Sequence, residues 1–307
     1  MAGINSSIIS FKDRGNWGDS RYRGNCSGYV HKGLIEQYNV KSLGEVFAGS
    51  GTGSDVCKEM GIDYLGLDLN PNPIRPDIIS GFNVLTDDIP DAFYGRDMIF
   101  MHPPYGAEIN IPYAGSQWNA PNIEELKLQD LGQMPWDTFM YALNYVVMKF
   151  YTALDKGSRM AILMGDVKRK GKLYSMLTDI VKIGELEQII IKAQHNCWSD
   201  NRTYSNRNFV PIEHEYIMVL KKASDYIMSC SIPKKIELDI RDSQCATWQA
   251  VVRATLQKLG GEAKLDAIYN ELDGRKKCEN CKDWKAKVRQ TLQYYFASTE
   301  RGVWKIA

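Results

Sequence analysis

The chain of 307 residues is predicted to be an α/β protein with a mainly parallel sheet, followed by a small, mainly helical module. Three observations predict this fold. Short apolar runs alternate with segments of helical spacing over residues 45–220, which indicates strand–helix crossover units. Chemically distinctive segments follow several of these runs, at the end of the strand where such sheets bind ligands. The last fifth of the chain has helical periodicity and an excess of positive charge.

The composition is that of an ordinary globular protein. Hydrophobic residues make up 44% and charged residues 24%, with a formal net charge of +1, which argues against disorder and fibrous repeats. No run approaches the roughly 18 apolar residues of a membrane span, and the N-terminus lacks the pattern of a signal peptide. Seven scattered cysteines argue against a disulfide framework and favour a reducing cytoplasm.

Apolar runs and helical spacing give the expected elements in order. The predicted strands are 45–48, 64–67, 97–101, 159–164, 186–191 and 215–220. The predicted helices are 54–60, 136–154 and 173–183. Segment 165–172 is expected to be a loop at the carboxyl end of a strand.

Glycines at 49, 51 and 53 form a turn after the first predicted strand. Alternating glycines let the backbone turn tightly and approach a ligand. Asp68 ends the next strand, where a carboxylate suits the two hydroxyls of a ribose. A dinucleotide fingerprint and a P-loop do not fit, because Ser54 replaces the third glycine or alanine and no Lys follows Gly53. The pattern favours an adenosine-containing cofactor such as S-adenosylmethionine; a purely structural turn is the alternative.

His102, Pro103, Pro104 and Tyr105 follow the third predicted strand. Two prolines fix the backbone and remove two N–H donors, so the preceding carbonyls stay free as acceptors. The aromatic ring beside them can stack on a planar group. This combination suits the exocyclic amino group of a base that has been turned out of its stack.

The segment resembles the catalytic motif of the amino DNA methyltransferases, which methylate adenine N6 or cytosine N4 with S-adenosylmethionine. That motif is Asp, Asn or Ser, then Pro-Pro, then Tyr, Phe or Trp. The family's cofactor motif, Phe-x-Gly-x-Gly, is matched by Phe47, Gly49 and Gly51. The resemblance covers residues 11–222 and implies a Rossmann-like class I methyltransferase sheet. The order of the motifs implies that target recognition lies after Tyr105.

The same resemblance implies a set of cofactor-binding residues. Segment 22–28 is similar to the motif that closes over the methionine part of the cofactor, Asp68 matches the acidic ribose ligand, and Phe82 and Asn83 fall where the family contacts adenine. The complete predicted set is Tyr22, Arg23, Asn25, Ser27, Phe47, Ala48, Gly49, Gly51, Thr52, Asp68, Leu69, Phe82, Asn83 and His102. No metal is predicted.

His102 departs from the family motif, which has Asp, Asn or Ser at this place. Neutral imidazole offers one nitrogen acceptor and protonated imidazole offers none, so His102 is expected to act as a neutral acceptor with help from the Pro103 carbonyl. The predicted activity is site-specific DNA methylation of a flipped base, with adenine N6 favoured. Cytosine N4, an RNA or protein amide substrate, and a catalytically silent DNA-binding protein remain as alternatives.

Several segments are candidates for DNA contact. Cations cluster over residues 168–172, although a solvated loop is the alternative, and residues 195–211 mix aromatic, basic and amide side chains. Residues 107–135, with Tyr113 and Trp118, are expected to close over the flipped base. The predicted DNA contacts are Lys168, Arg169, Lys170, Lys172, Trp198, Arg202, Tyr204, Arg207, Lys285 and Arg289.

The chain is expected to have a methyltransferase domain over 1–225, a linker over 226–242 and a second domain over 243–307. Residues 241–307 hold 13 Lys/Arg and 8 Asp/Glu, a net charge of +5. Predicted helices at 248–259, 264–272 and 283–296 and a strand at 302–306 resemble a winged helix-turn-helix; an interaction or dimerisation module is the alternative. The Cys278-x-x-Cys281 pair lacks the further ligands of a zinc site.

Double-stranded DNA is the expected partner, and no membrane partner is expected. The sequence leaves open a restriction or phage partner and a homodimer. The expected location is the cytoplasm, as a bacterial or phage-encoded protein associated with the nucleoid.

Overall fold

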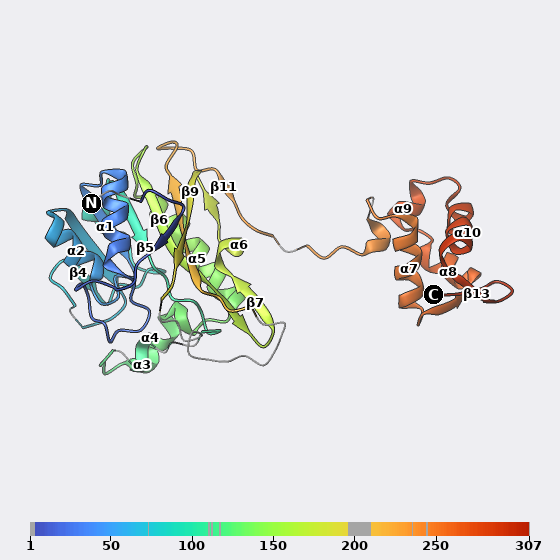
Figure 1. Cartoon of the computed structure of the whole chain (residues 1–307), viewed down its shortest axis with the longest axis horizontal. Coiled ribbons are helices and arrows are strands. Elements are labelled where there is room, and N and C mark those ends of the chain that lie inside the picture. Colours follow the sequence, from blue (N-terminus) through green and yellow to red (C-terminus); the bar gives the residue numbers. More distant parts are fainter. Residues whose placement is uncertain are drawn as a thin grey trace. The chain divides into compact units, whose positions relative to one another are not determined.

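The computed structural model describes residues 4–72, 74–109, 111, 113–116, 118–195, 210–234, 236–243 and 245–306. The chain divides into two compact units, Met1–Pro233 and Lys234–Ala307 (Figure 1). The division lies within the stretch expected as a linker. That stretch also contains β11 (Cys230–Ser231), which pairs with β8 (Lys182–Ile183), and the 3-10 turn η3 (Ile240–Asp242).

The first unit is built on a mostly parallel sheet, as predicted. The order of its strands is β1-β9-β10-β6-β5-β2-β3-β4, with β7 paired to β6. Strand β10 runs antiparallel to both of its neighbours, β6 and β9. The strands are β1 (Ile8–Ser10), β2 (Ser42–Val46), β3 (Asp63–Asp68), β4 (Ile78–Ser80), β5 (Met98–Met101), β6 (Arg159–Arg169), β7 (Lys172–Ser175), β9 (Glu185–Ala193) and β10 (His214–Lys221).

Helices cover both faces of this sheet. Helices α1 (Gly28–Tyr38) and α2 (Thr52–Met60) pack on one face, and α5 (Trp136–Tyr151) packs on the other (Figure 1). Strand β5 is buried on both faces, because Met98 and Phe100 join one core cluster while Ile99 and Met101 join the other. Burial on both faces explains why all four residues of β5 are apolar. The shorter helices are α3 (Tyr113–Ser116), α4 (Ile123–Gln129) and α6 (Met176–Asp179), with 3-10 turns η1 (Asp91–Phe93) and η2 (Leu131–Gln133).

Two predictions for residues 165–183 are wrong. Strand β6 does not end at residue 164; it continues to Arg169 and forms a hairpin with β7. Lys170 and Gly171 make the turn, both with positive φ (49° and 79°), which is the backbone of a tight two-residue hairpin. The helix expected over 173–183 is confined to the four residues of α6, flanked by β7 and β8.

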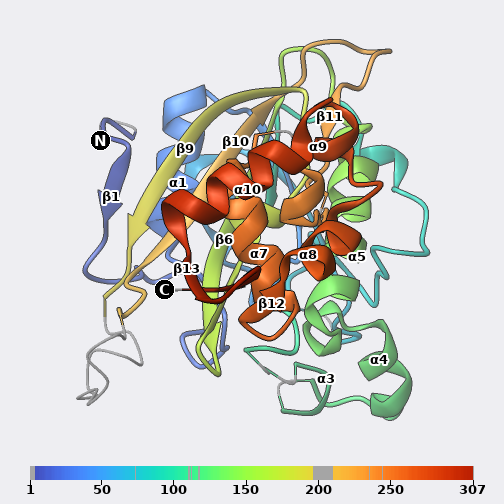
Figure 2. The ribbon, with the colours of Figure 1, turned by 90° about the vertical axis from the view of Figure 1, so that its right-hand side faces the viewer.

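The second unit has its own hydrophobic core. Its helices are α7 (Trp248–Lys258), α8 (Leu265–Leu272), α9 (Lys276–Glu279) and α10 (Trp284–Tyr295) (Figure 2). Its antiparallel sheet has the order β12-β14-β13, from Glu262–Lys264, Val303–Lys305 and Ala297–Glu300. The side chains of Val251, Leu256, Ile268 and Leu292 are fully buried there. The three predicted long helices and the final strand are therefore present.

None of the helices in the described part of the chain has the length and apolarity that crossing a bilayer requires.

Candidate active site

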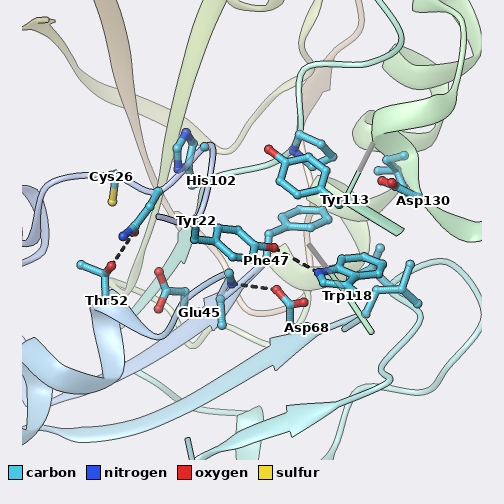
Figure 3. Close-up of a pocket in the computed structure, with 18 of the residues that line it drawn as sticks. Tyr22, Cys26, Glu45, Phe47, Thr52, Asp68, His102, Tyr113, Trp118 and Asp130 are labelled. Carbon is cyan, nitrogen blue, oxygen red and sulfur yellow. Dashed lines mark hydrogen bonds between the residues drawn. The ribbon is translucent and has the colours of Figure 1, made fainter. Parts of the chain in front are cut away.

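A pocket of about 760 Å³, open to solvent, lies at the carboxyl ends of β2, β3 and β5 (Figure 3). We call it the Asp68 pocket. It brings together many of the residues expected to bind the cofactor. Those that line it are Tyr22, Asn25, Phe47, Ala48, Gly49, Thr52, Asp68, Leu69, Asn83 and His102. Pro104 of the predicted catalytic motif also lines it.

Four residues of the predicted cofactor set do not line this pocket. Ser27 caps α1 by accepting a hydrogen bond from the Tyr29 N–H. Gly51 lies at the start of α2 with φ +81°, where a Cβ would come within 2.8 Å of the Arg75 side chain. Phe82 is buried in the core under the pocket, and Arg23 is absent from the lining. Their neighbours Gly49, Thr52 and Asn83 contribute instead.

Asp68 is held in a fixed orientation inside the pocket. Its Oδ2 accepts a hydrogen bond from the Gly49 N–H at 2.7 Å (Figure 3). Its Oδ1 accepts one from the Asn70 N–H at 2.8 Å. Burial raises the pKa of Asp68 to about 6, although the two N–H donors oppose this shift. Each carboxylate oxygen has a further lone pair, so Asp68 can still accept two hydroxyl hydrogens from a ribose.

An aromatic wall closes one side of the Asp68 pocket. The rings of Tyr22 and Tyr113 stack at 5.9 Å, and those of Tyr113 and Trp118 stack at 6.3 Å. The Trp118 indole N–H donates to the Tyr22 hydroxyl at 3.3 Å (Figure 3). Segment 107–135 was expected to close over the flipped base. Among its described residues, Ile109, Ile111 and Tyr113 line a second cleft, and Trp118 lines the Asp68 pocket.

The second cleft, here called the Tyr105 cleft, adjoins the Asp68 pocket. Its volume is about 1380 Å³ including the opening to solvent, and Pro103 and Tyr105 line it. Four residues line both cavities: Gly24, Asn25, His102 and Tyr113. The predicted catalytic motif therefore lies at the boundary between two cavities, so a molecule in one can meet a molecule in the other beside His102.

Hydrogen bonds fix the Tyr105 ring in its cleft. The Tyr105 hydroxyl donates to Glu215 Oε1 at 2.8 Å, and Lys192 Nζ donates to Glu215 Oε2 at 2.8 Å. Burial raises the pKa of Glu215, but the charge and hydrogen bond of Lys192 and the hydrogen bond from Tyr105 act against burial, and the net shift is downward, so the carboxylate stays ionised. Burial and the Glu215 charge raise the pKa of Tyr105 well above its ordinary value, which keeps the phenol protonated. Gly165 leaves room for the ring, since a Cβ there would lie 2.9 Å from Tyr105 Cε2.

This network constrains the imidazole of His102. Its Nε2 lies 3.3 Å from the Tyr105 hydroxyl oxygen. Because that hydroxyl gives its hydrogen to Glu215, the network assigns the donor role to His102 Nε2. A neutral His102 then has Nδ1 as its acceptor, and the Cys26 thiol also interacts with His102. The imidazole is thus more engaged with the protein than a simple acceptor for substrate.

Sequence reasoning missed several residues that line the Asp68 pocket. They are Glu45, Val84, Gln129, Asp130 and Leu131. Gly24 and Cys26 lie within segment 22–28, which was expected to close over the cofactor, and Tyr113 and Trp118 were expected to close over the flipped base. Glu45 had a usable signal, because it is an acidic residue at the start of an apolar run and is buried in β2. Residues 129–131 had no comparable signal in the sequence, because they reach the pocket only through the packing of α4 and η2.

The residues predicted to contact DNA lie on the β6–β7 hairpin, on α10, or outside the described residues. Arg169, Lys170 and Lys172 are exposed on the β6–β7 hairpin, and the Arg169 guanidinium donates to the carbonyls of Ala107 and Glu108 at 3.1 and 2.7 Å. Lys168 lies on the same hairpin. Lys285 and Arg289 are exposed on α10 of the second unit. Trp198, Arg202, Tyr204 and Arg207 lie outside the described residues.

No group of three or more His, Cys, Asp or Glu side chains suited to a metal occurs in the described ranges. Cys278 is buried in the core of the second unit. Burial raises the pKa of its thiol to about 11. Cys278 therefore packs as an apolar residue.

No protein-family model matches the chain, and no curated protein matches it. Similar solved structures include TrmN from Thermus thermophilus, at 15% identity and a TM-score of 0.34 over 65% of this chain and 50% of that one. The chain thus spans half the length of TrmN. A SAM-dependent methyltransferase from Archaeoglobus fulgidus has 11% identity and a TM-score of 0.33 over 64% of this chain and 95% of that one. A 16S rRNA (adenine(1408)-N(1))-methyltransferase from Catenulisporales acidiphilia has 10% identity and a TM-score of 0.33 over 65% and 95%.

The order of the strands defines the fold. A mostly parallel sheet with antiparallel β10 between β6 and β9 is the Rossmann-like class I methyltransferase sheet that the sequence predicted. The Asp68 pocket fits S-adenosylmethionine, because it combines an oriented carboxylate, a glycine turn and an aromatic wall.

Proposed function

We propose that the protein is an S-adenosylmethionine-dependent methyltransferase that acts on the exocyclic amino group of a nucleobase. The favoured acceptor is adenine N6 in double-stranded DNA. One observation carries the proposal: His102 lines both the Asp68 pocket and the Tyr105 cleft. The Asp68 pocket provides a site for the cofactor, and the Tyr105 cleft provides a site for a planar acceptor.

The residues of the chain bind and orient the two reactants. Asp68 accepts hydrogen bonds from the ribose hydroxyls of the cofactor, which when bound supplies a methyl group activated by its sulfonium sulfur. Tyr105, held by Glu215, presents its ring to the base. The Pro103 carbonyl and His102 accept hydrogens from the amino group. Catalysis of this kind depends on proximity and orientation, and the proton leaves to water after transfer.

The distribution of cations supports a nucleic acid as the acceptor. Lys12 and Arg14 line the Tyr105 cleft together with Asp13, and Lys192 lines it in an ion pair with Glu215. The bonds of Arg169 to Ala107 and Glu108 hold the cationic β6–β7 hairpin against the segment that follows Tyr105. The second unit adds a net charge of +5 over residues 241–307. Cations placed in this way favour contacts with phosphates.

To test this proposal, the protein is incubated with methyl-labelled S-adenosylmethionine and one of three acceptors: duplex DNA, RNA or a mixture of other proteins. We expect label in DNA, and we expect Tyr105→Ala to lower the rate about 100-fold or more because stacking on the base is lost. The matched control is Tyr141→Ala, since Tyr141 is 80% exposed on α5 and lines neither cavity. It should keep the wild-type rate.

Each other outcome of this test assigns a different function. Label in RNA or protein but not in DNA would contradict the proposed acceptor. No transfer to any of them, with binding of the cofactor established by calorimetry, would contradict catalysis and favour a silent DNA-binding protein.

A further inference from the structure

A buried row of ionisable side chains ends in the wall of the Asp68 pocket. Cys26 Sγ lies 3.8 Å from His31 Nδ1, and His31 Nε2 lies 2.8 Å from Glu45 Oε1. The Tyr64 hydroxyl donates to Glu45 Oε2 at 2.5 Å. Cys26, His31 and Glu45 are 7%, 1% and 3% exposed. The proposed methyl transfer to a base uses none of these groups.

The surrounding fold holds this cluster rigidly. Cys26 lies just before α1, His31 is in α1 and Glu45 is in β2. The His31 ring packs at 4.4 Å from the ring of Phe100. A Cβ at Gly53 would lie 2.1 Å from Glu45 Oε2 and 3.1 Å from His31 Nε2, so α2 leaves no room for Glu45 to move away. The imidazole is therefore fixed between the thiol and the carboxylate.

A thiol, an imidazole and a carboxylate in this order make an activated nucleophile, because the imidazole takes the thiol proton and the carboxylate stabilises the imidazolium. Burial raises the pKa of Cys26, but His31 and His102 more than offset burial and bring it down to about 6. Burial lowers the pKa of His31, and Cys26 and Glu45 reverse this and raise it to about 10. Both shifts favour a thiolate paired with an imidazolium.

The position of Cys26 decides what the thiolate can reach. Cys26 and Glu45 both line the Asp68 pocket, and Cys26 interacts with His102 at the boundary of the Tyr105 cleft. Cys57 provides a contrast within the same unit. It is also a buried free cysteine, but it lines neither cavity, and burial raises the pKa of its thiol far above the ordinary value.

We propose that Cys26 is a nucleophile that takes the methyl group of the bound cofactor when no acceptor occupies the Tyr105 cleft, so that the protein methylates itself. This inference rests on the proposed function for the identity of the cofactor. The Cys26 sulfur forms a bond to the methyl carbon, and the bond from that carbon to the sulfonium sulfur breaks. The electron pair stays with the departing thioether, giving S-methylcysteine and S-adenosylhomocysteine. The thiol proton remains on His31.

Self-methylation would close the site. The added methyl group projects from the Cys26 sulfur at the wall of the Asp68 pocket. The sulfur also loses the negative charge that it held beside His31. A protein kept with cofactor but without acceptor is therefore expected to lose activity, whereas an acceptor in the cleft competes for the same methyl group.

In the test, the 307-residue protein is incubated at pH 7 with trideuteromethyl S-adenosylmethionine and without nucleic acid. It is then digested with trypsin and analysed by mass spectrometry. Cys26 falls in peptide Gly24–Lys32 and Cys57 in peptide Ser42–Lys58, so each peptide reports one cysteine. We expect one trideuteromethyl group on the Cys26 peptide and none on the Cys57 peptide. Added duplex DNA should slow the labelling.

Variants of Cys26, His31 and Glu45 show whether labelling depends on activation of the thiol or only on its position near the cofactor. Cys26→Ser should abolish the label, because a neutral hydroxyl is a far weaker nucleophile. His31→Gln should slow labelling about tenfold or more, since a thiol of ordinary pKa is only a few per cent ionised at pH 7. Glu45→Gln keeps the shape of the cluster and should slow labelling to a smaller extent. Melting curves and calorimetry with the cofactor establish that each variant is folded and binds.

The outcomes distinguish this inference from the proposed function. Cofactor binding and methylated DNA with an unlabelled Cys26 peptide would overturn the inference and leave the proposed function standing. Equal label on both peptides, or full labelling in His31→Gln, would also overturn it. Absence of cofactor binding would overturn both.

Discussion

The imidazole of His102 connects two side-chain networks, one through Tyr105 to Glu215 and one through Cys26 to His31. The motif residues could be found from sequence because they are contiguous. The partners could not, since Glu215 lies 110 residues after Tyr105 and meets it only when β10 inserts beside β6. The same holds for Cys26, His31 and Glu45, which share no sequence motif. Local patterns thus identified the candidate catalytic residues but not the groups that surround them.

Binding of the cofactor should depend on pH through Asp68. Its pKa is about 6, because burial raises it. Ribose hydroxyls need the ionised carboxylate as an acceptor, so affinity is retained above this pKa and is lost as pH falls through it. Below pH 6 each pH unit should weaken binding about tenfold. Calorimetry between pH 8 and pH 5 measures the dissociation constant.

Asp68→Asn is the matched control for this titration. An amide keeps the size of the side chain and does not ionise, so it should bind weakly at pH 8 and show a flatter pH dependence. A wild-type dissociation constant that stays level from pH 7 to pH 5 would contradict the assignment of Asp68 to the ribose.

Elements with a clear apolar periodicity were predicted well. Elements in which charged residues interrupt that periodicity were not. The strand at 97–101 and the helix over 136–154 were evident because burial on two faces, or along one stripe, leaves an unbroken apolar pattern. The β6–β7 hairpin was missed because the cations of 168–172 conceal its alternation, in which Val167 alone is buried between Asp166 and Lys168. Tertiary pairing, rather than local preference, sets this segment.

Strand β6 also shapes the Tyr105 cleft, and Gly165→Ala tests this. The new methyl group would lie 2.9 Å from the Tyr105 ring and should displace the ring from Glu215. We expect the rate constant of methyl transfer to fall about tenfold, with an overpacking cost of about 1–3 kcal/mol in unfolding free energy. Steady-state kinetics and urea denaturation measure the two effects.

Gly157→Ala is the comparison for the stability effect. Gly157 has φ +92° and open space around it, so alanine there costs backbone strain of about 1 kcal/mol without touching the cleft. Its rate constant should equal that of the wild type. If Gly165→Ala also transfers methyl groups at the wild-type rate, the position of the Tyr105 ring does not limit catalysis.

At the scale of the whole molecule, two units with separate cores carry different charge. The first unit holds the two cavities that meet at His102, and the second has a core of its own and exposed cations on α10. From charge balance and helical spacing, a second domain was expected over 243–307. The role of the second unit as a winged helix-turn-helix that binds duplex DNA stays a prediction, because recognition depends on side chains in a groove and not on the elements alone.

The measurement that tests the central claim most directly identifies the methylated base. Unmethylated duplex DNA of broad sequence content is incubated with the protein and S-adenosylmethionine, digested to nucleosides and analysed by mass spectrometry. We predict N6-methyladenine, with its rate of formation lowered about 100-fold or more when Tyr105→Ala replaces the wild type. N4-methylcytosine would retain the amino-group mechanism and change the base. Methylation at a ring carbon or ring nitrogen, or no methylated nucleoside despite bound cofactor, would contradict the account.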